Sequence, residues 1–248
     1  MWTRVLQAEV ADELRGIVRE PTALFFSVVM PVAFFALFVS IYGDYSNGGV
    51  SSATLMVANF GTFGVLAVTL VTPGVGVARD REIGWLRAKR VSAVPISVTL
   101  AAKVAAALPY ALTVLAAMTV TAMFTGSLDT STARLLAVAG ILLLGCLPFA
   151  LLSVAIGLRA GTNTTVAVLQ AILMPSAVLS GLWMPLSILP EFIGDLARFL
   201  PTYHLAQLAV GQVDPGRDSG AVGHVLVLVA SACVCAGLAA MSYRRGQA

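Results

Sequence analysis

The residues able to do chemistry are few in this chain, and they are unevenly placed. Seven charged side chains lie between residues 79 and 90, while the whole sequence holds only two histidines, His204 and His224. Enzymatic chemistry requires a nucleophile beside a base, or clustered metal ligands. The three cysteines lie inside apolar stretches, as small hydrophobic side chains do, and no carboxylates cluster near the histidines. The sequence therefore predicts a chain that is not an enzyme and binds no metal.

The composition identifies the solvent of this protein. Apolar residues make up 58% of the 248 residues and charged residues 11%, against about 45–50% and about 25% in ordinary globular chains. Twelve acids and fifteen bases cannot cover the surface of a water-soluble domain of this size. The net charge of +3 does not indicate nucleic-acid binding, because only two bases are lysines and the arginines lie between apolar runs. The chain is predicted to reside in a membrane.

Six stretches are long and apolar enough to cross a bilayer, which requires about 20 residues of helix. No internal repeat or low-complexity linker divides them, and the first run is too long for a cleavable signal peptide. We therefore predict an all-α integral membrane protein with a single domain over residues 1–248. The predicted spans are residues 23–42, 53–77, 98–124, 135–158, 166–184 and 221–242.

The distribution of basic residues predicts the orientation, because cytoplasmic segments of membrane proteins are enriched in Lys and Arg. With the N-terminus inside, eleven bases fall on cytoplasmic segments and three on external ones, and Lys103 lies near the inner end of the third span. Both termini are thus predicted to face the cytoplasm. The inner bases are Arg4, Arg15, Arg19, Arg79, Arg81, Arg87, Lys89, Arg90, Arg159, Arg244 and Arg245, and the outer ones are Arg134, Arg198 and Arg217.

Two segments outside the spans have helical periodicity. Residues 1–20 place Trp2, Leu6, Val10, Leu14 and Ile17 on one face, which predicts a helix at the membrane interface or one packed on a cytosolic partner. Residues 185–210 form an external hairpin of amphipathic helix broken by Pro190 and Pro201. In that hairpin, Glu191, Asp195 and Arg198 are predicted to form an exposed ion-pair face, and His204 is interpreted as an interfacial polar group.

The charged loop at residues 78–97 is predicted to contain a short helix. Asp80 is placed to cap its N-terminus, Glu82 lies in its first turn, and Arg87 lies near its end, where a cation suits the helix dipole. Pro95 ends the loop and Ser97 is placed to cap the next span. From spacing alone, this segment either contacts a partner or merely enforces topology.

Asn59, Asn163, Gln170 and several Thr are the main polar groups within or at the ends of the predicted spans. The predicted spans carry no ionisable side chain near a helix centre. This disfavours a proton- or sodium-coupled carrier, whose ion pathway requires such groups. The chain also lacks the glycine-rich phosphate loop of ATPases. Energy for any transport would therefore come from a separate polypeptide.

Two motifs resemble the type-2 ABC transporter permeases. Glu82, Gly84, Trp85, Leu86 and Arg87, followed by Ser92 and Pro95, are similar to the family's cytoplasmic loop. Gly181, Pro185, Pro190, Pro201, Tyr203 and His204 are similar to its pattern before the last helix. The resemblance implies that the loop contains a coupling helix, which docks on an ATPase subunit through Arg79, Asp80, Arg81, Glu82, Gly84, Trp85, Leu86 and Arg87. Trp85 and Arg87 depart from the family, which commonly has a smaller and an acidic residue there.

The chain resembles in particular the small bacterial exporters of drugs and lipids that include the daunorubicin-resistance permeases. This implies two permeases, identical or paralogous, and two ATPase subunits that bind ATP and Mg²⁺, in the cell membrane. It also implies alternating access, with spans two and five lining a path for a hydrophobic or amphipathic substrate. Candidate substrate contacts are Asn59, Phe60, Phe63, Gln170 and Met174, for which ordinary helix packing is the alternative. A membrane scaffold and a secondary carrier are the other functions considered.

Overall fold

The computed structural model describes residues 2–19, 21–42, 46–47, 50–91, 95–125, 128–184, 186, 189–214, 216 and 220–245. Ser92, Pro185 and Arg217 lie outside the described residues. The helices are α1 (Trp2–Val18), α2 (Pro21–Tyr42), α3 (Ser52–Glu82), α4 (Trp85–Arg90), α5 (Ile96–Phe124), α6 (Thr132–Gly145), α7 (Leu147–Gly157), α8 (Thr162–Leu179), α9 (Glu191–Ala197), α10 (Pro201–Val213) and α11 (Ala221–Arg245). Two short antiparallel strands, β1 (Ser46–Asn47) and β2 (Val50–Ser51), pair just before α3.

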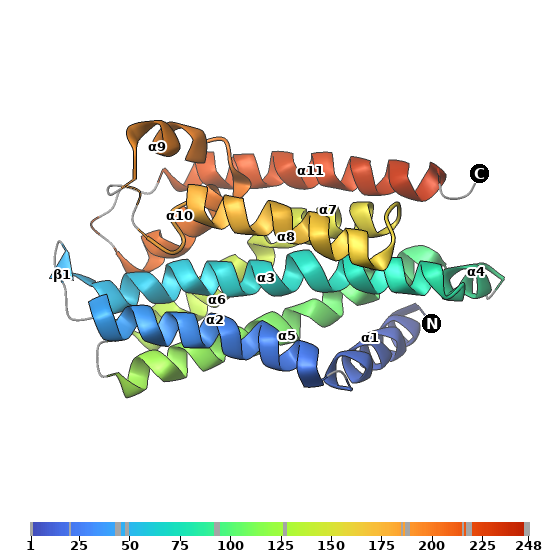
Figure 1. Ribbon diagram of the computed structural model, residues 1–248, viewed down its shortest axis with the longest axis horizontal. Coiled ribbons are helices and arrows are strands. Elements are labelled where there is room, and N and C mark those ends of the chain that lie inside the picture. The colour runs from blue at the N-terminus through green and yellow to red at the C-terminus, as the bar shows by residue number, and fades with distance from the viewer. Residues whose placement is uncertain are drawn as a thin grey trace.

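The long helices lie side by side along the long axis of the molecule (Figure 1). Both chain ends and α4 lie at one end of this bundle, which we call the α4 end. The strand β1 and helix α9 lie at the opposite end, which we call the α9 end. The α4 end therefore gathers the segments that the sequence predicts to be cytoplasmic.

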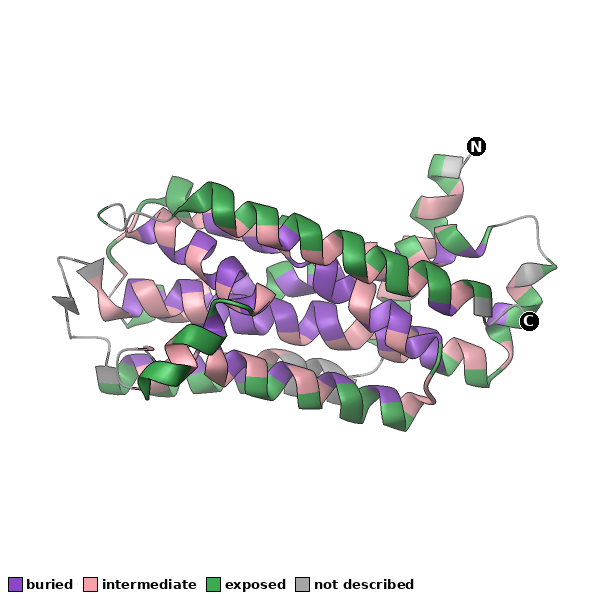
Figure 2. Ribbon diagram, turned by 90° about the horizontal axis from the view of Figure 1, so that it is seen from above, coloured by how far each residue is buried: buried purple, intermediate pink, exposed green. Residues whose placement is uncertain are grey.

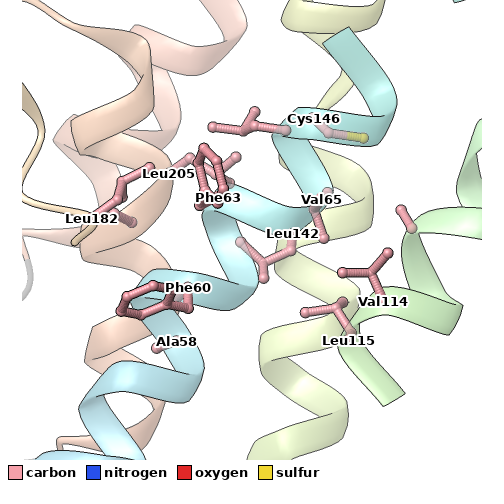
Figure 3. Close-up of a cluster of buried hydrophobic side chains, with 14 of the residues drawn as sticks. Ala58, Phe60, Phe63, Val65, Val114, Leu115, Leu142, Cys146, Leu182 and Leu205 are labelled. Atoms are coloured by element: carbon pink, nitrogen blue, oxygen red, sulfur yellow. The ribbon is translucent and has the colours of Figure 1, made fainter. Parts of the chain in front are cut away.

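Helix α3 is the centre of the bundle and contacts α2, α5, α7, α8 and α10. Its sequence is apolar around most of its circumference, as expected for a helix surrounded by others. Figure 2 shows buried residues concentrated in the interior of the bundle, while the outer faces of the surrounding helices are exposed. In the core, Phe60 and Phe63 of α3 lie among Leu115 of α5, Leu142 of α6 and Leu205 of α10 (Figure 3).

Helices α3 and α7 approach each other closely enough for direct backbone contact. The backbone N–H of Gly74, directly after Pro73 in α3, donates a hydrogen bond to Ser153 Oγ at 2.6 Å. One turn further along α7, Gly157 packs against the carbonyl of Gly74. Ser153 and Gly157 form a small-xxx-small pair, which lets helix backbones approach closely within a membrane. The contact leaves no room for a β-carbon at Gly74 or Gly157.

Among the described residues, five helical segments are long and apolar enough to cross a membrane: Ser52–Glu82, Ile96–Phe124, Thr132–Gly157, Thr162–Leu179 and Ala221–Arg244. A shorter apolar stretch, Val28–Ile41, lies within α2. The all-helical membrane architecture predicted from the sequence is therefore confirmed for five spans. The sixth crossing, through α2, stays a prediction.

Three predicted spans differ clearly from the structure. Helix α3 continues to Glu82 instead of ending near Val77. The predicted fourth span is divided at Cys146 into α6 and α7, because Pro148 occupies the first turn of a new helix. Helix α8 ends at Leu179, not at Met184, because Gly181 has a φ of 72° and Leu182 N–H bonds back to the carbonyl of Ala177. Those last features form a glycine-based helix stop.

Candidate functional site

At the α4 end, the last turn of α3 holds the turn that joins α7 to α8. The guanidinium of Arg81 donates to the carbonyl oxygens of Leu158 and Ala160, at 3.0 and 2.6 Å. The carboxylate of Glu82 accepts from the Thr162 backbone N–H at 3.0 Å and from its hydroxyl at 2.5 Å. We call this set of contacts the clasp. It ties α3 to α8 through side chains that are 77 to 80 residues from their partners.

Glu82 acts as the missing N-cap of α8. The residue at the cap position, Gly161, has no side chain to accept from the first amides of the helix. Glu82 supplies that acceptor from another helix, and its negative charge suits the positive end of the α8 dipole. The sequence prediction placed Glu82 in the first turn of the loop helix, which was wrong because α3 had not yet ended there.

Replacing Glu82 with alanine is expected to open the clasp locally. The Thr162 amide loses its acceptor, so its hydrogen exchange should accelerate roughly tenfold while the centre of the bundle stays protected. Hydrogen–deuterium exchange of the purified protein measures this directly. Glu191→Ala, which removes an exposed acid in the first turn of α9 at the opposite end, is the matched control. Unchanged exchange at Thr162 in Glu82→Ala would contradict the cap.

The loop helix itself is α4, and it begins after a sharp turn at Gly84. Gly84 has a φ of 78°, a left-handed conformation that favours glycine, which explains why a glycine stands between Glu82 and Trp85. Asp80 is therefore not the N-cap of this helix, as predicted, because it lies inside α3. Within α4, Leu86 is 5% exposed and packs with Val77 of α3.

The opposite surface of α4 is open to solvent. Ile83, just before α4, and Trp85 in its first turn are exposed, as is the side chain of Arg87. Leu86 thus faces the bundle, while Arg87, Trp85 and the preceding Ile83 face outward. Such a mixture of aromatic, aliphatic and Arg side chains is typical of protein-contact surfaces.

Two lysines connect α1 to this region. Lys103 of α5 is 4% exposed and lies 2.8 Å from Asp80 of α3 and 2.7 Å from Glu13 of α1. Lys89 of α4 forms an ion pair with Glu9 of α1. We call these five residues the ion cluster. Since Glu9 and Glu13 are one helical turn apart, they present one acidic face of α1 to both lysines.

The ion cluster was missed by the sequence analysis, which gave Lys103 no partner and Asp80 a capping role. The available signal was the pair of acids four residues apart on α1, together with a single lysine inside an apolar span. Buried lysines require paired charges because burial of an isolated charge is costly. The cluster fixes α1 against α4 and α5, so α1 is packed on the protein in this structure.

At the α9 end, a cavity of about 330 Å³ lies between α3, the segment after α8, and α10. It contains two of the five predicted substrate contacts, Asn59 and Phe60. Its polar groups are hydroxyls and amides without formal charge. The other lining residues are Ser52, Leu55, Met56, Ser180, Gly181, Leu182, Trp183, Met184, Leu186, Gln207 and Val210.

The remaining predicted contacts lie elsewhere. Phe63 is buried and contacts Trp183 edge-to-face, with ring centroids 5.2 Å apart. It therefore packs against a residue that lines the cavity without lining the cavity itself. Gln170 and Met174 belong to α8 and do not line the cavity. Gln170 Oε1 is buried without a hydrogen-bond partner among the described residues, and Met174 is 41% exposed. Three of the five predicted contacts are therefore at or next to the cavity, and the other two are on α8 away from it.

Trp183 was not identified from the sequence, although it organises this cavity. Its ring lies parallel to that of Phe34 of α2, with centroids 6.4 Å apart, and also contacts Phe63 of α3. Aromatic pairs of this kind add stability beyond their buried area. Trp183 thereby links α2, α3 and the segment following α8 in one aromatic cluster.

The two histidines meet at the same end of the bundle. His204 Nε2 donates to the carbonyl of Arg198 at 2.8 Å, so in the neutral ring Nδ1 is an acceptor. That Nδ1 lies 2.6 Å from Nδ1 of His224, which must then be the donor. The sequence analysis did not predict this contact between α10 and α11. Of the ion-pair face predicted for Glu191, Asp195 and Arg198, the pair between Asp195 and Arg198 is present, exposed and 3.8 Å apart.

The chain is similar to known transport proteins over most of its length. The family model described as "ABC-2 type transporter" matches residues 4–212, which extend from α1 to the end of α10. The protein named "Putative transport permease YvfS" from Bacillus subtilis (strain 168) is 24% identical over 231 residues, and 91% of each chain is covered. The match includes the clasp, the ion cluster and the lining of the cavity.

Proposed function

Since the chain belongs to the ABC-2 type transporter family, whose model covers residues 4–212, we propose that it is the membrane permease subunit of an ATP-driven exporter. A separate ATPase subunit binds ATP and Mg²⁺, and this chain binds no cofactor. The observation that carries the proposal is the α4 end, where a short helix with an exposed arginine packs through Leu86 in one cluster with side chains of three spans, α3, α5 and α7. Such a helix suits the transfer of movement from a partner to the membrane.

The proposed path of this movement runs through the clasp and the ion cluster. ATP-driven closure of the ATPase dimer displaces α4, and Leu86 passes the displacement to α3 and α7. The clasp then pulls α8, because Arg81 and Glu82 hold the turn before it. Through Lys89 and Lys103, α1 and α5 move with the same unit.

We assign six transmembrane crossings, with α2 as the first, and both termini in the cytoplasm of a bacterial cell. The excess of basic residues at the α4 end supports this orientation. Two copies of the permease, identical or paralogous, work with two ATPases. The substrate is hydrophobic or amphipathic, drug-like or lipid-like, since Asn59, Phe60 and Trp183 combine uncharged polar and aromatic surface in one cavity.

Two other functions account for fewer of these features. A scaffold subunit could use α4 to bind a partner, but it would not require the clasp to reach α8. A secondary carrier requires ionisable groups along its ion path. Lys103 of α5 and Asp80 of α3 are paired with each other near the α4 end, so they stabilise the packing of these two helices and do not form an ion path.

The test separates docking from coupling by means of two variants. Arg87→Ala removes an exposed cation from α4 and is expected to lower the amount of ATPase that co-purifies in mild detergent. Glu82→Ala leaves the α4 surface intact, so the ATPase should stay bound while ATP-dependent transport falls at least fivefold, a coupling change of ordinary size. Arg134→Ala, an exposed arginine at the start of α6, is the control and should alter neither. Equal behaviour of all three variants would exclude α4 as the docking helix.

A further inference from the structure

An apolar groove of about 470 Å³ lies on the outside of the bundle between α5, α7 and α11. Its walls hold four alanines, Ala101, Ala105, Ala239 and Ala240, whose small side chains leave the space open. Ser97 and Tyr243 stand where it begins, close to the α4 end. It lies among helices that span the membrane, so its surroundings are lipid.

The length of the groove matches one leaflet. It extends along α5 from Ser97 to Leu108, which corresponds to about 16 Å of helix. Half of the hydrocarbon core of a bilayer is about 15 Å thick. A single acyl chain that enters at Ser97 and Tyr243 would therefore fill the groove along its length.

Basic residues stand at or just beyond the α4-end termini of two of the helices that line the groove. Helices α5, α7 and α11 contain no Asp or Glu. Exposed arginines stand at their ends: Arg159, two residues beyond α7, and Arg244, next to Tyr243 in α11. Lys103 is not available to a ligand because it is held in the ion cluster. Basic groups beside spans on the cytoplasmic side attract anionic lipid headgroups.

The groove is also connected to the docking helix. Leu100, Val104 and Tyr243 line it and also pack against the small cluster that contains Leu86 of α4. An acyl chain lying in the groove would thus be separated from α4 by one layer of side chains. It would support the packing beneath this helix from the membrane side.

We propose that the groove binds one acyl chain of an anionic phospholipid of the inner leaflet, with the phosphate held by Arg159 and Arg244, and that this lipid supports α4. The orientation and the role of α4 are taken from the proposed function. The binding itself depends only on the groove and on the arginines.

The experiment is native mass spectrometry of the purified full-length chain, without any ATPase, after exchange into detergent containing phosphatidylglycerol or phosphatidylcholine. The wild type should retain phosphatidylglycerol preferentially. Ala240→Phe fills the groove and should reduce the retained lipid about tenfold, the effect of excluding two buried methylene groups. Ala236→Phe, an exposed alanine one turn away that does not line the groove, is the matched control.

A second variant keeps the test independent of packing. Arg244→Gln leaves the groove open and should abolish the preference for phosphatidylglycerol while phosphatidylcholine is still retained. Equal lipid retention in Ala240→Phe and Ala236→Phe would overturn the proposal, as would an unchanged preference in Arg244→Gln. If Ala240→Phe altered the oligomeric state of the chain and not its bound lipid, the occupant would be a second copy. Because no ATPase is present, none of these results depends on the proposed export function.

Discussion

Lys103→Met is expected to destabilise the protein by about 3 kcal/mol or more, the usual cost of leaving buried charges without their partner. Lys103 is almost fully buried and faces two carboxylates, Asp80 and Glu13, which come from different helices. Without the ammonium group, both acids lose their counter-ion and repel each other. Chemical denaturation of the purified protein in mixed micelles measures the change in the free energy of unfolding.

Two further variants show whether charge is the cause. The triple variant Lys103→Met, Asp80→Asn, Glu13→Gln removes all three charges and should recover most of the lost stability, because neutral groups cost less to bury. Arg198→Met removes one partner of the exposed pair at the α9 end and should change stability by less than about 0.5 kcal/mol. A Lys103→Met variant as stable as the wild type would show that the ion cluster does not join α1, α3 and α5.

Gly157→Ala is the second change for which we expect a large effect, about 3 kcal/mol of destabilisation. A β-carbon at this position meets the backbone carbonyl of Gly74, and neither residue has a flexible side chain that could give way. Helices α3 and α7 must then separate, which also breaks the hydrogen bond between Gly74 N–H and Ser153 Oγ. Thermal unfolding in detergent measures the loss.

Gly140→Ala and Gly237→Ala are the matched controls for this change. Both glycines lie inside helices, α6 and α11, and a β-carbon would meet nothing within 4 Å at either position. Each control should be neutral or stabilising by roughly 0.5–1 kcal/mol, since alanine favours helix more than glycine does. If Gly157→Ala behaved like these two, the close contact between α3 and α7 would be disproved.

The helical membrane architecture could be predicted because the bilayer imposes length and hydrophobicity on each span. Five predicted spans correspond to helices of the structure, and the family predicted from two short motifs is confirmed. Gly84 shows why one of those motifs is informative, because the turn between α3 and α4 requires a positive φ. Signals of this kind can be read from the sequence because they depend only on adjacent residues.

Most contacts of the clasp and the ion cluster could not be predicted because their partners lie 77 to 90 residues apart. Glu82 beside Gly84 looked like the start of a helix, and only the position of α8 shows that it caps another one. The break at Cys146 was missed because Leu135–Leu158 is apolar throughout, and hydrophobicity does not distinguish one bent span from two helices. Trp183 was overlooked for the same reason: its importance depends on Phe34 and Phe63, which reach it from other helices.

Affinity purification of the tagged chain from its host in mild detergent tests most directly whether this permease depends on a separate ATPase held at α4. Mass spectrometry then identifies the proteins that accompany it and their proportions. We predict an ATPase with a phosphate loop in an amount about equal to that of the permease, and its partial loss in Arg87→Ala. A monodisperse, folded permease that purifies with no ATPase, and whose transport follows a proton gradient without ATP, would contradict this dependence.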